Sequence, residues 1–237
     1  MRERLIEYMH NGTLLEGYLA WDETRTGPRP AVMISHAWAG RSEFEQAKAR
    51  ALAELGYAGF ALDMYGKNVL GTTPEQNTKL MTPFMNDRRM LQGRQLAALA
   101  ALREQADIDT GRVAAMGFCF GGLCVLDLAR AGADVRGVVS FHGLLAKPDK
   151  IENGKITAKV LVLHGHDDPM VSVEQVVEFE GEMSTANVDW QVHAYGATMH
   201  SFTNPAANNP AAGTVYNPRA ERRSWASLVN FLAEVMV

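Results

Sequence analysis

The sequence predicts an α/β protein with a mostly parallel central sheet, helices on both faces and an antiparallel hairpin at the N-terminus. Short runs that are apolar throughout alternate with segments of helical spacing, a pattern typical of a parallel sheet covered on both sides. Asn11-Gly12 separates two early strand-like segments and indicates a hairpin turn. The length of 237 residues suits one domain, so we expect residues 1–237 to fold as a single unit.

Each element has its own signal. We expect the hairpin strands at 5–9 and 14–21, and further strands at 31–35, 57–62, 113–116, 138–141, 160–163 and 190–195. Gly56 ends a helix at 43–55. Further helices are expected at 73–105, with a break near Pro83, and at 123–130, 171–183 and 218–236. Residues 201–218 are rich in Asn, Pro, Ala and Gly and are expected to form a loop.

Composition excludes several classes of protein. The net charge is −4, the pI is about 6.0 and no basic stripe occurs, which argues against a nucleic-acid partner. No apolar run approaches 18 residues and no apolar leader follows Met1, so we expect neither a membrane span nor a signal peptide. The two cysteines, Cys119 and Cys124, do not form a disulfide framework; reduced thiols and a cytoplasmic location are the expectation.

The most informative motif is Gly117-Phe118-Cys119-Phe120-Gly121, which follows an apolar run and precedes a helical segment. A strand, then G-x-nucleophile-x-G, then a helix is the nucleophile elbow of the α/β-hydrolase fold. With 21 Gly and 2 Cys, G-x-C-x-G should occur by chance about 0.02 times in such a chain. A helix N-terminus beside the thiol favours a thiolate and an oxyanion. The alternative is a structural cysteine buried in a glycine-rich turn.

A cysteine nucleophile needs a base and an acid that orients the base, in the chain order nucleophile, acid, histidine. The loop after 160–163 contains Asp167 and Asp168. The spacing Gly165-x-x-Asp168-x-x-Val171, usual in such hydrolases, favours Asp168 as the acid. The alternative is that Asp168 only caps the next helix.

Of the seven histidines, only His200 lies in a loop between the last predicted strand and the last helix. We therefore expect His200 to be the base. His193 falls inside the strand at 190–195, where it would point into a face of the sheet rather than into a cleft.

These segments together resemble the dienelactone hydrolase family: G-F-C-F-G-G around Cys119, G-H-D-D-P-M-V around Asp168 and M-H-S-F around His200. The resemblance spans nearly the whole chain. It implies a single α/β-hydrolase domain, a Cys-His-Asp triad, no cofactor or metal, a monomer, and hydrolysis of small esters or lactones. Residues 36–40 are similar to the family's oxyanion loop, so the backbone N–H groups of Trp38 and Phe120 are the expected oxyanion donors.

The chain departs from the family pattern at two positions. Ala37 stands where a glutamate helps to ionise the thiol, and Asn204 stands where an arginine pairs with the carboxylate of the name-giving enol-lactone. Three arginines before the elbow, Arg88, Arg89 and Arg94, could supply a cation, or could form a solvated helix face. We therefore expect a natural substrate other than dienelactone.

The remaining expectations concern the pocket and the rival functions. The pocket lining is expected from loops within 63–83 and 201–218, with the aromatic residues Trp38, Tyr65, Phe120 and Phe202 either near the cleft or in the core. A thiol-based redox enzyme, with Cys124 as its resolving thiol, and an acyltransferase stay open as alternatives. A non-enzymatic binding module on the same fold is a further alternative.

Overall fold

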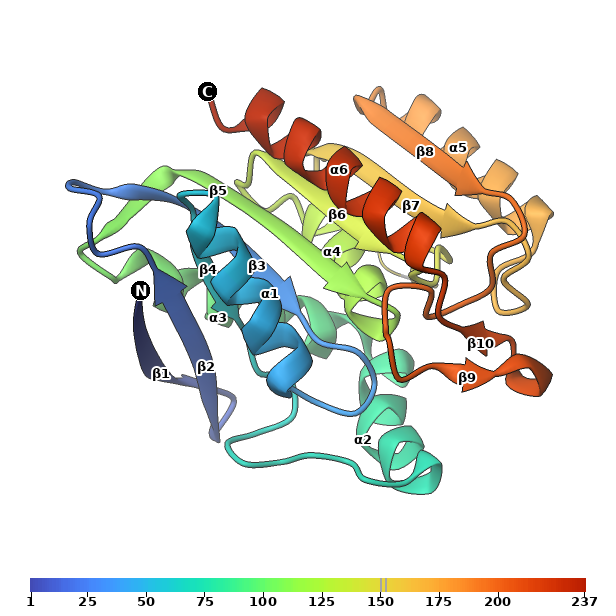
Figure 1. Ribbon diagram of the computed structural model, residues 1–237, viewed down its shortest axis with the longest axis horizontal. Helices are drawn as coiled ribbons and strands as arrows, with labels where there is room; N and C mark the ends of the chain where they lie inside the picture. Colours follow the sequence, from blue (N-terminus) through green and yellow to red (C-terminus); the bar gives the residue numbers. More distant parts are fainter. Residues whose placement is uncertain (150, 152) are drawn as a thin grey trace.

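The computed structural model describes residues 1–149, 151 and 153–237. Its centre is an eight-stranded sheet in the order β1-β2-β4-β3-β5-β6-β7-β8 (Figure 1). The strands are β1 (Arg2–His10), β2 (Thr13–Trp21), β3 (Arg29–Ser35), β4 (Ala58–Ala61), β5 (Ile108–Phe118), β6 (Gly137–Phe141), β7 (Lys159–Gly165) and β8 (Trp190–Tyr195). The last six strands in this order, β4 to β8, pair with one another in parallel. Strand β1 pairs antiparallel with β2, and β2 pairs antiparallel with β4. The predicted fold class is confirmed.

The helices form one layer on each face of the sheet. They are α1 (Glu43–Glu54), α2 (Pro74–Asn86), α3 (Arg88–Arg103), α4 (Phe120–Arg130), α5 (Val173–Thr185) and α6 (Pro218–Val235). Alternate residues of β3 explain the two layers, since side chains of a strand point to opposite faces. Met33 belongs to the core under α2 to α5, whereas Val32 and Ile34 belong to the core under α1 and α6 (Figure 1).

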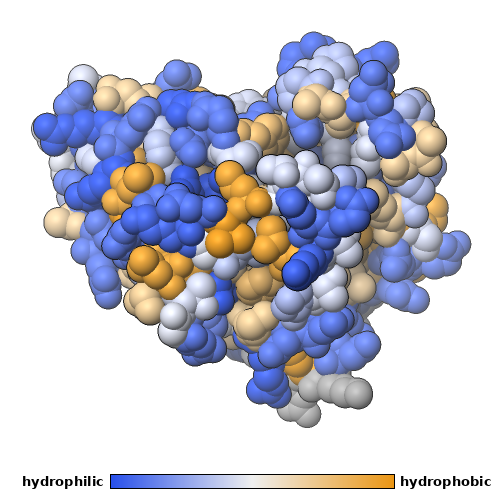
Figure 2. All heavy atoms as spheres, turned by 90° about the horizontal axis from the view of Figure 1, so that it is seen from below, coloured by the Kyte–Doolittle hydropathy of each residue, from blue (hydrophilic) through white to orange (hydrophobic). Residues whose placement is uncertain are grey.

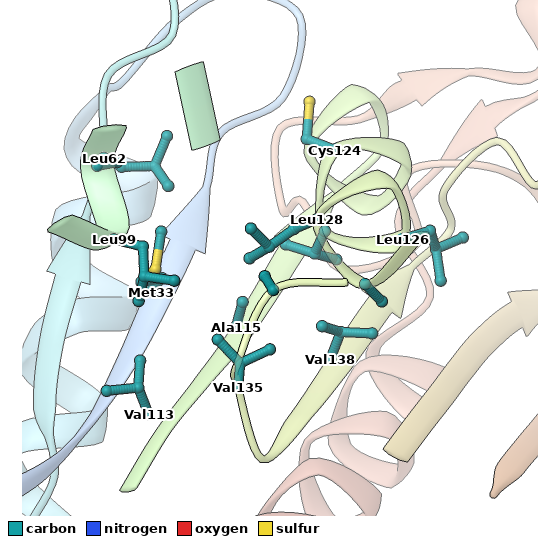
Figure 3. Packing of buried hydrophobic residues seen from close by; sticks show 14 of the residues in the cluster. Met33, Leu62, Leu99, Val113, Ala115, Cys124, Leu126, Leu128, Val135 and Val138 are labelled. Carbon is teal, nitrogen blue, oxygen red and sulfur yellow. The ribbon is translucent and has the colours of Figure 1, made fainter. Parts of the chain in front are cut away.

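Helix α4 crosses the centre of the sheet and is buried along its whole length. Figure 3 shows Leu128 of α4 over Ala115 of β5, with Val138 of β6 nearby and Cys124 on the same helix. Cys124 is completely buried. The elbow that precedes α4 is therefore attached to a helix that is buried throughout.

Three local predictions differ from the structure. The long helical segment is interrupted at Asp87 rather than at Pro83, because Asp87 accepts the N–H of Met90 and caps α3, while α2 accommodates Pro83 within its last turns. Strand β5 begins at Ile108, earlier than the apolar run suggests. The segment 201–218 is not all loop: it contains the short pair β9 (Asn208–Asn209) and β10 (Thr214–Val215) around a single 3₁₀ turn.

A buried ion cluster ties α3, α4 and α5 together. The Asp127 carboxylate accepts from Arg88 at 2.5 Å and 2.7 Å and from Arg130 at 3.3 Å, and Arg130 also binds Glu182 at 2.7 Å. Arg130 further donates to the carbonyl of Leu145 at 2.8 Å. The cluster thereby fixes the loop that follows β6.

Arg88 and Arg94 form neither a solvated helix face nor a cation for the substrate, so both expectations are wrong for these two residues. Both are buried; Arg94 donates to the carbonyl of Met64 at 2.7 Å and to His10 at 3.1 Å. Only Arg89 of the three is exposed.

Among the helices of the described residues, none has the length and apolar character needed to cross a bilayer.

Candidate active site

Cys119 occupies the sharp turn between β5 and α4, with φ 55° and ψ −116°. A non-glycine residue at positive φ is strained, which is typical of a nucleophile elbow. The flanking glycines are required by close contacts: a Cβ on Gly117 would lie 2.1 Å from the carbonyl of Gly121, and one on Gly121 would lie 2.1 Å from that of Ser35. Cys119 is partly exposed, whereas its neighbours Phe118 and Phe120 are buried.

The predicted acid and the predicted base meet at the same edge of the sheet. Asp168 follows β7 and His200 follows β8, and their Oδ2 and Nδ1 atoms are 2.7 Å apart. Both residues are at most 4% exposed, whereas Asp167 is exposed. Asp168 also accepts the N–H of Met170 at 2.8 Å, which fixes the carboxylate. The structure thus brings Asp168, not Asp167, to His200.

The electrostatic surroundings of His200 favour its charged form. Burial opposes the imidazolium, but the hydrogen bond that His200 donates to Asp168 and the thiolate form of Cys119 outweigh it and raise the pKa of His200 to about 10. Its Nε2 atom is buried and has no hydrogen-bond partner among the described residues. Because Nδ1 is engaged by Asp168, Nε2 is the atom that could exchange a proton with a substrate or a thiol.

A cavity of about 150 Å³ opens directly over Cys119. Its walls come from the loop after β3, the start of α1, the elbow and the segment after His200; the lining residues are Ala37, Trp38, Ala39, Gly40, Ser42, Phe44, Glu45, Phe118, Cys119, His142, Ser201, Thr203 and Asn204. A larger cavity of about 700 Å³ lies along α5, but the described residues that line it include no Cys, His or Ser, so we place the site at the smaller one.

The loop after β3, which we expect to hold the oxyanion, forms one wall of the cavity. Trp38 lines the cavity, and its carbonyl accepts from the hydroxyl of Tyr65 at 2.9 Å, which supports the loop from behind. Phe120 is the first residue of α4, where a helical N–H has no partner within the helix. The side chains of Phe120 and Phe202 are completely buried and belong to the core. The expected lining from 63–83 is wrong for this cavity, because the start of α1 lies there instead.

Charge in the cavity is carried by one carboxylate. Glu45 is 2% exposed and accepts from the N–H and hydroxyl of Ser42 at 2.8 Å, and from the N–H of Ala37 at 3.4 Å. No Lys or Arg occurs among the lining residues that the structure describes, and Asn204 lies exposed at the rim.

Apolar residues lie beside the cavity. The exposed residues Val69 and Leu70 adjoin Gly40 in the loop after β3. Figure 2 shows hydrophobic residues gathered across the middle of this lower face of the molecule.

Sequence reasoning missed the roles of three residues at the cavity: Glu45, His142 and Thr203. The signal for His142 was available, since it directly follows β6 as Cys119 directly follows β5, and the carboxyl ends of adjacent parallel strands share an edge. Thr203 and Glu45 carried no comparable signal, because their positions depend on how a loop and α1 turn back over the sheet. His193 behaves as expected: it lies in β8 and contacts Ser227 at 3.1 Å.

Comparisons with known proteins identify the family of the chain. The model of the dienelactone hydrolase family matches residues 15–236. A dienelactone hydrolase-like promiscuous phosphotriesterase from metagenomic libraries superposes with a TM-score of 0.95 at 37% identity, covering 100% of this chain and 99% of the other. An uncharacterized protein of Caenorhabditis elegans is 40% identical over 58% of this chain and 89% of its own length.

A more distant relative covers more of the sequence. The probable 2-oxo-3-(5-oxofuran-2-ylidene)propanoate lactonase of Bradyrhizobium is 25% identical over 94% of this chain and 90% of its own length. The chain therefore belongs to the dienelactone hydrolase family and is a hydrolase of esters or lactones.

Proposed function

We propose that the chain hydrolyses small neutral esters or lactones through a thioester on Cys119, with His200 as the base and Asp168 as the acid that orients it. The observation that supports this most directly is the 2.7 Å contact between His200 and Asp168 beside a cysteine in an elbow. Asp168 holds the imidazole in the tautomer whose Nε2 is available and stabilises the imidazolium.

The reaction has two steps. The Cys119 thiolate attacks the carbonyl carbon, and the leaving alkoxide takes a proton from the His200 imidazolium as the thioester forms. His200, now neutral, removes a proton from water, and the hydroxide cleaves the thioester to give the carboxylic acid and the Cys119 thiolate, which restores the starting pair of thiolate and imidazolium. The N–H groups of Trp38 and Phe120 would hold the oxyanion, each such donor contributing about 10²–10³-fold in rate.

The test is a series of p-nitrophenyl acyl esters, C2 to C8, followed by intact mass spectrometry. We expect a burst of p-nitrophenol and a mass increase equal to one acyl group, because acylation of a thiol with an activated ester precedes hydrolysis. Cys119→Ala should abolish both, whereas Cys124→Ala, the matched control, should retain them, since Cys124 is buried in the core. An adduct that persists in Cys119→Ala would contradict the proposal.

A second prediction concerns the charge of the substrate. Because the cavity contains the Glu45 carboxylate and no Lys or Arg among its described lining residues, a substrate carboxylate would lose its hydration without gaining an ion pair there. We expect kcat/KM for p-nitrophenyl pentanoate to exceed that for mono-p-nitrophenyl succinate, which has a similar length, by at least about tenfold at low salt. Glu45→Gln should lower the ratio of the two kcat/KM values. Equal kcat/KM values for the two esters in the wild type would show that Glu45 does not select against a charged substrate.

The thiol-redox alternative gains no support from the geometry. Burial raises the pKa of the Cys124 thiol well above its usual range, and Cys124 is completely buried, so it is poorly suited to resolve a sulfenic acid on Cys119.

A further inference from the structure

Beyond the candidate triad, His142 is a buried histidine that lies between the segment carrying Cys119 and the segment carrying His200. Its Nδ1 atom is 3.2 Å from the backbone nitrogen of Cys119, and its Nε2 atom is 2.8 Å from the hydroxyl of Thr203. His142 is 3% exposed and Thr203 is 1% exposed. One ring therefore bridges the elbow and the loop that follows His200.

These contacts favour one tautomer of His142. The N–H of Cys119 is shared: it donates to the carbonyl of Phe141 at 3.0 Å and to Nδ1 of His142 at 3.2 Å. Because a backbone N–H can only donate, Nδ1 is the acceptor, and the ring proton lies on Nε2 and is donated to Thr203. Protonating Nδ1 would set two N–H groups against each other. Burial, together with the nearby His200, accordingly holds the pKa of His142 well below its usual range. Because both ring nitrogens are occupied, His142 is not a second base.

The ring also restrains the catalytic histidine. It packs edge-on against the ring of His200 at 5.1 Å and against Phe202 at 5.0 Å. The backbone is strained on both sides of this contact: φ is 38° at His142, 55° at Cys119 and 58° at Ser201. Such conformations persist only where the surrounding structure holds them, and the bridge through His142 supplies that restraint.

We propose that His142 is a positioning residue whose ring, hydrogen-bonded to Thr203 and to the backbone of Cys119, fixes the His200 loop against the Cys119 elbow. The inference rests on the proposed Cys119–His200 pair. Without the bridge, His200 Nε2 would move away from the thiol of Cys119. The thiolate form of Cys119 would then be less stable and the chemical step slower, whereas the substrate cavity would still form. A misplacement of about 1 Å can cost on the order of 10²-fold in rate.

The test uses Thr203→Val, which keeps the shape of the side chain and removes the acceptor, with Thr203→Ser as the matched variant that keeps the hydroxyl. Both are compared with the wild type for kcat and KM on p-nitrophenyl butyrate and for the pH dependence of Cys119 alkylation by iodoacetamide. We expect Thr203→Val to lower kcat about tenfold or more with little change in KM. The midpoint of its alkylation profile should rise by about one pH unit. Thr203→Ser should have the same kcat and the same alkylation midpoint as the wild type.

A second variant keeps the test decisive if Thr203→Val folds poorly. His142→Asn retains an acceptor near the amide of Cys119 but cannot reach Thr203, and it should reproduce the shift in the alkylation profile. An unchanged kcat and an unchanged alkylation midpoint in folded Thr203→Val or His142→Asn would overturn the inference. Failure of the proposed function would instead appear as absent ester turnover in the wild type, while the alkylation profiles would still report whether the bridge positions His200.

Discussion

Replacing His200 with alanine is expected to lower kcat by about 10²–10⁴-fold, the usual contribution of a general base. The structure gives the reason: His200 Nε2 is buried without another partner among the described residues, and Nδ1 is held by Asp168. No carboxylate occupies position 37 to help ionise the thiol, so Cys119 depends on His200 and on the N-terminus of α4. The measurement is the steady-state rate on the best ester of the acyl series.

The matched control is His193→Ala, which removes a histidine from β8 that contacts only Ser227 among the hydrogen-bond partners described. This variant should keep its activity within about twofold, because His193 is only partly buried and does not line the cavity at Cys119. Retention of more than about a tenth of wild-type activity in His200→Ala would show that the base is misassigned.

Asp127→Ala should destabilise the fold by about 3–5 kcal/mol, the cost of leaving buried charges without their partner. Both Arg88 and Arg130 bind this carboxylate, and its side chain is fully buried. For a chain of this size the loss corresponds to a drop in melting temperature of roughly 10 °C. Urea unfolding followed by circular dichroism would measure it.

Asp134→Ala is the appropriate control, because Asp134 also pairs with an arginine, Arg103, but its side chain is 94% exposed. Its removal should change stability by less than about 1 kcal/mol, as is typical of surface ion pairs. Equal losses in the two variants would mean that burial does not determine the strength of the cluster.

The fold and the triad candidates could be predicted because each rests on a short local pattern. Continuous apolar runs indicate buried parallel strands, and Cys119, Asp168 and His200 each stand just past such a strand, at the edge where those strands end. The elbow glycines carry their own signal, since only glycine fits the close contacts at 117 and 121.

The parts that could not be predicted depend on contacts between distant segments. Arg88 has the same local signature as exposed Arg89, and only the approach of α4 with Asp127 makes it a buried residue. Likewise, Glu45 enters the cavity because α1 begins directly beneath the oxyanion loop, and Thr203 meets His142 because the loop after β8 folds back over β6. No spacing along the chain encodes such approaches.

The position of β8 at the edge of the sheet has a consequence for protein synthesis. The elbow is built from β3, β5 and α4, which precede β7 and β8 in the chain, whereas the candidate base His200 follows β8. Because domains generally fold as units, the three candidate triad residues can come together only after β8 and the loop that follows it have been synthesised. A chain that ended before β8 would contain Cys119 and Asp168 but would lack His200.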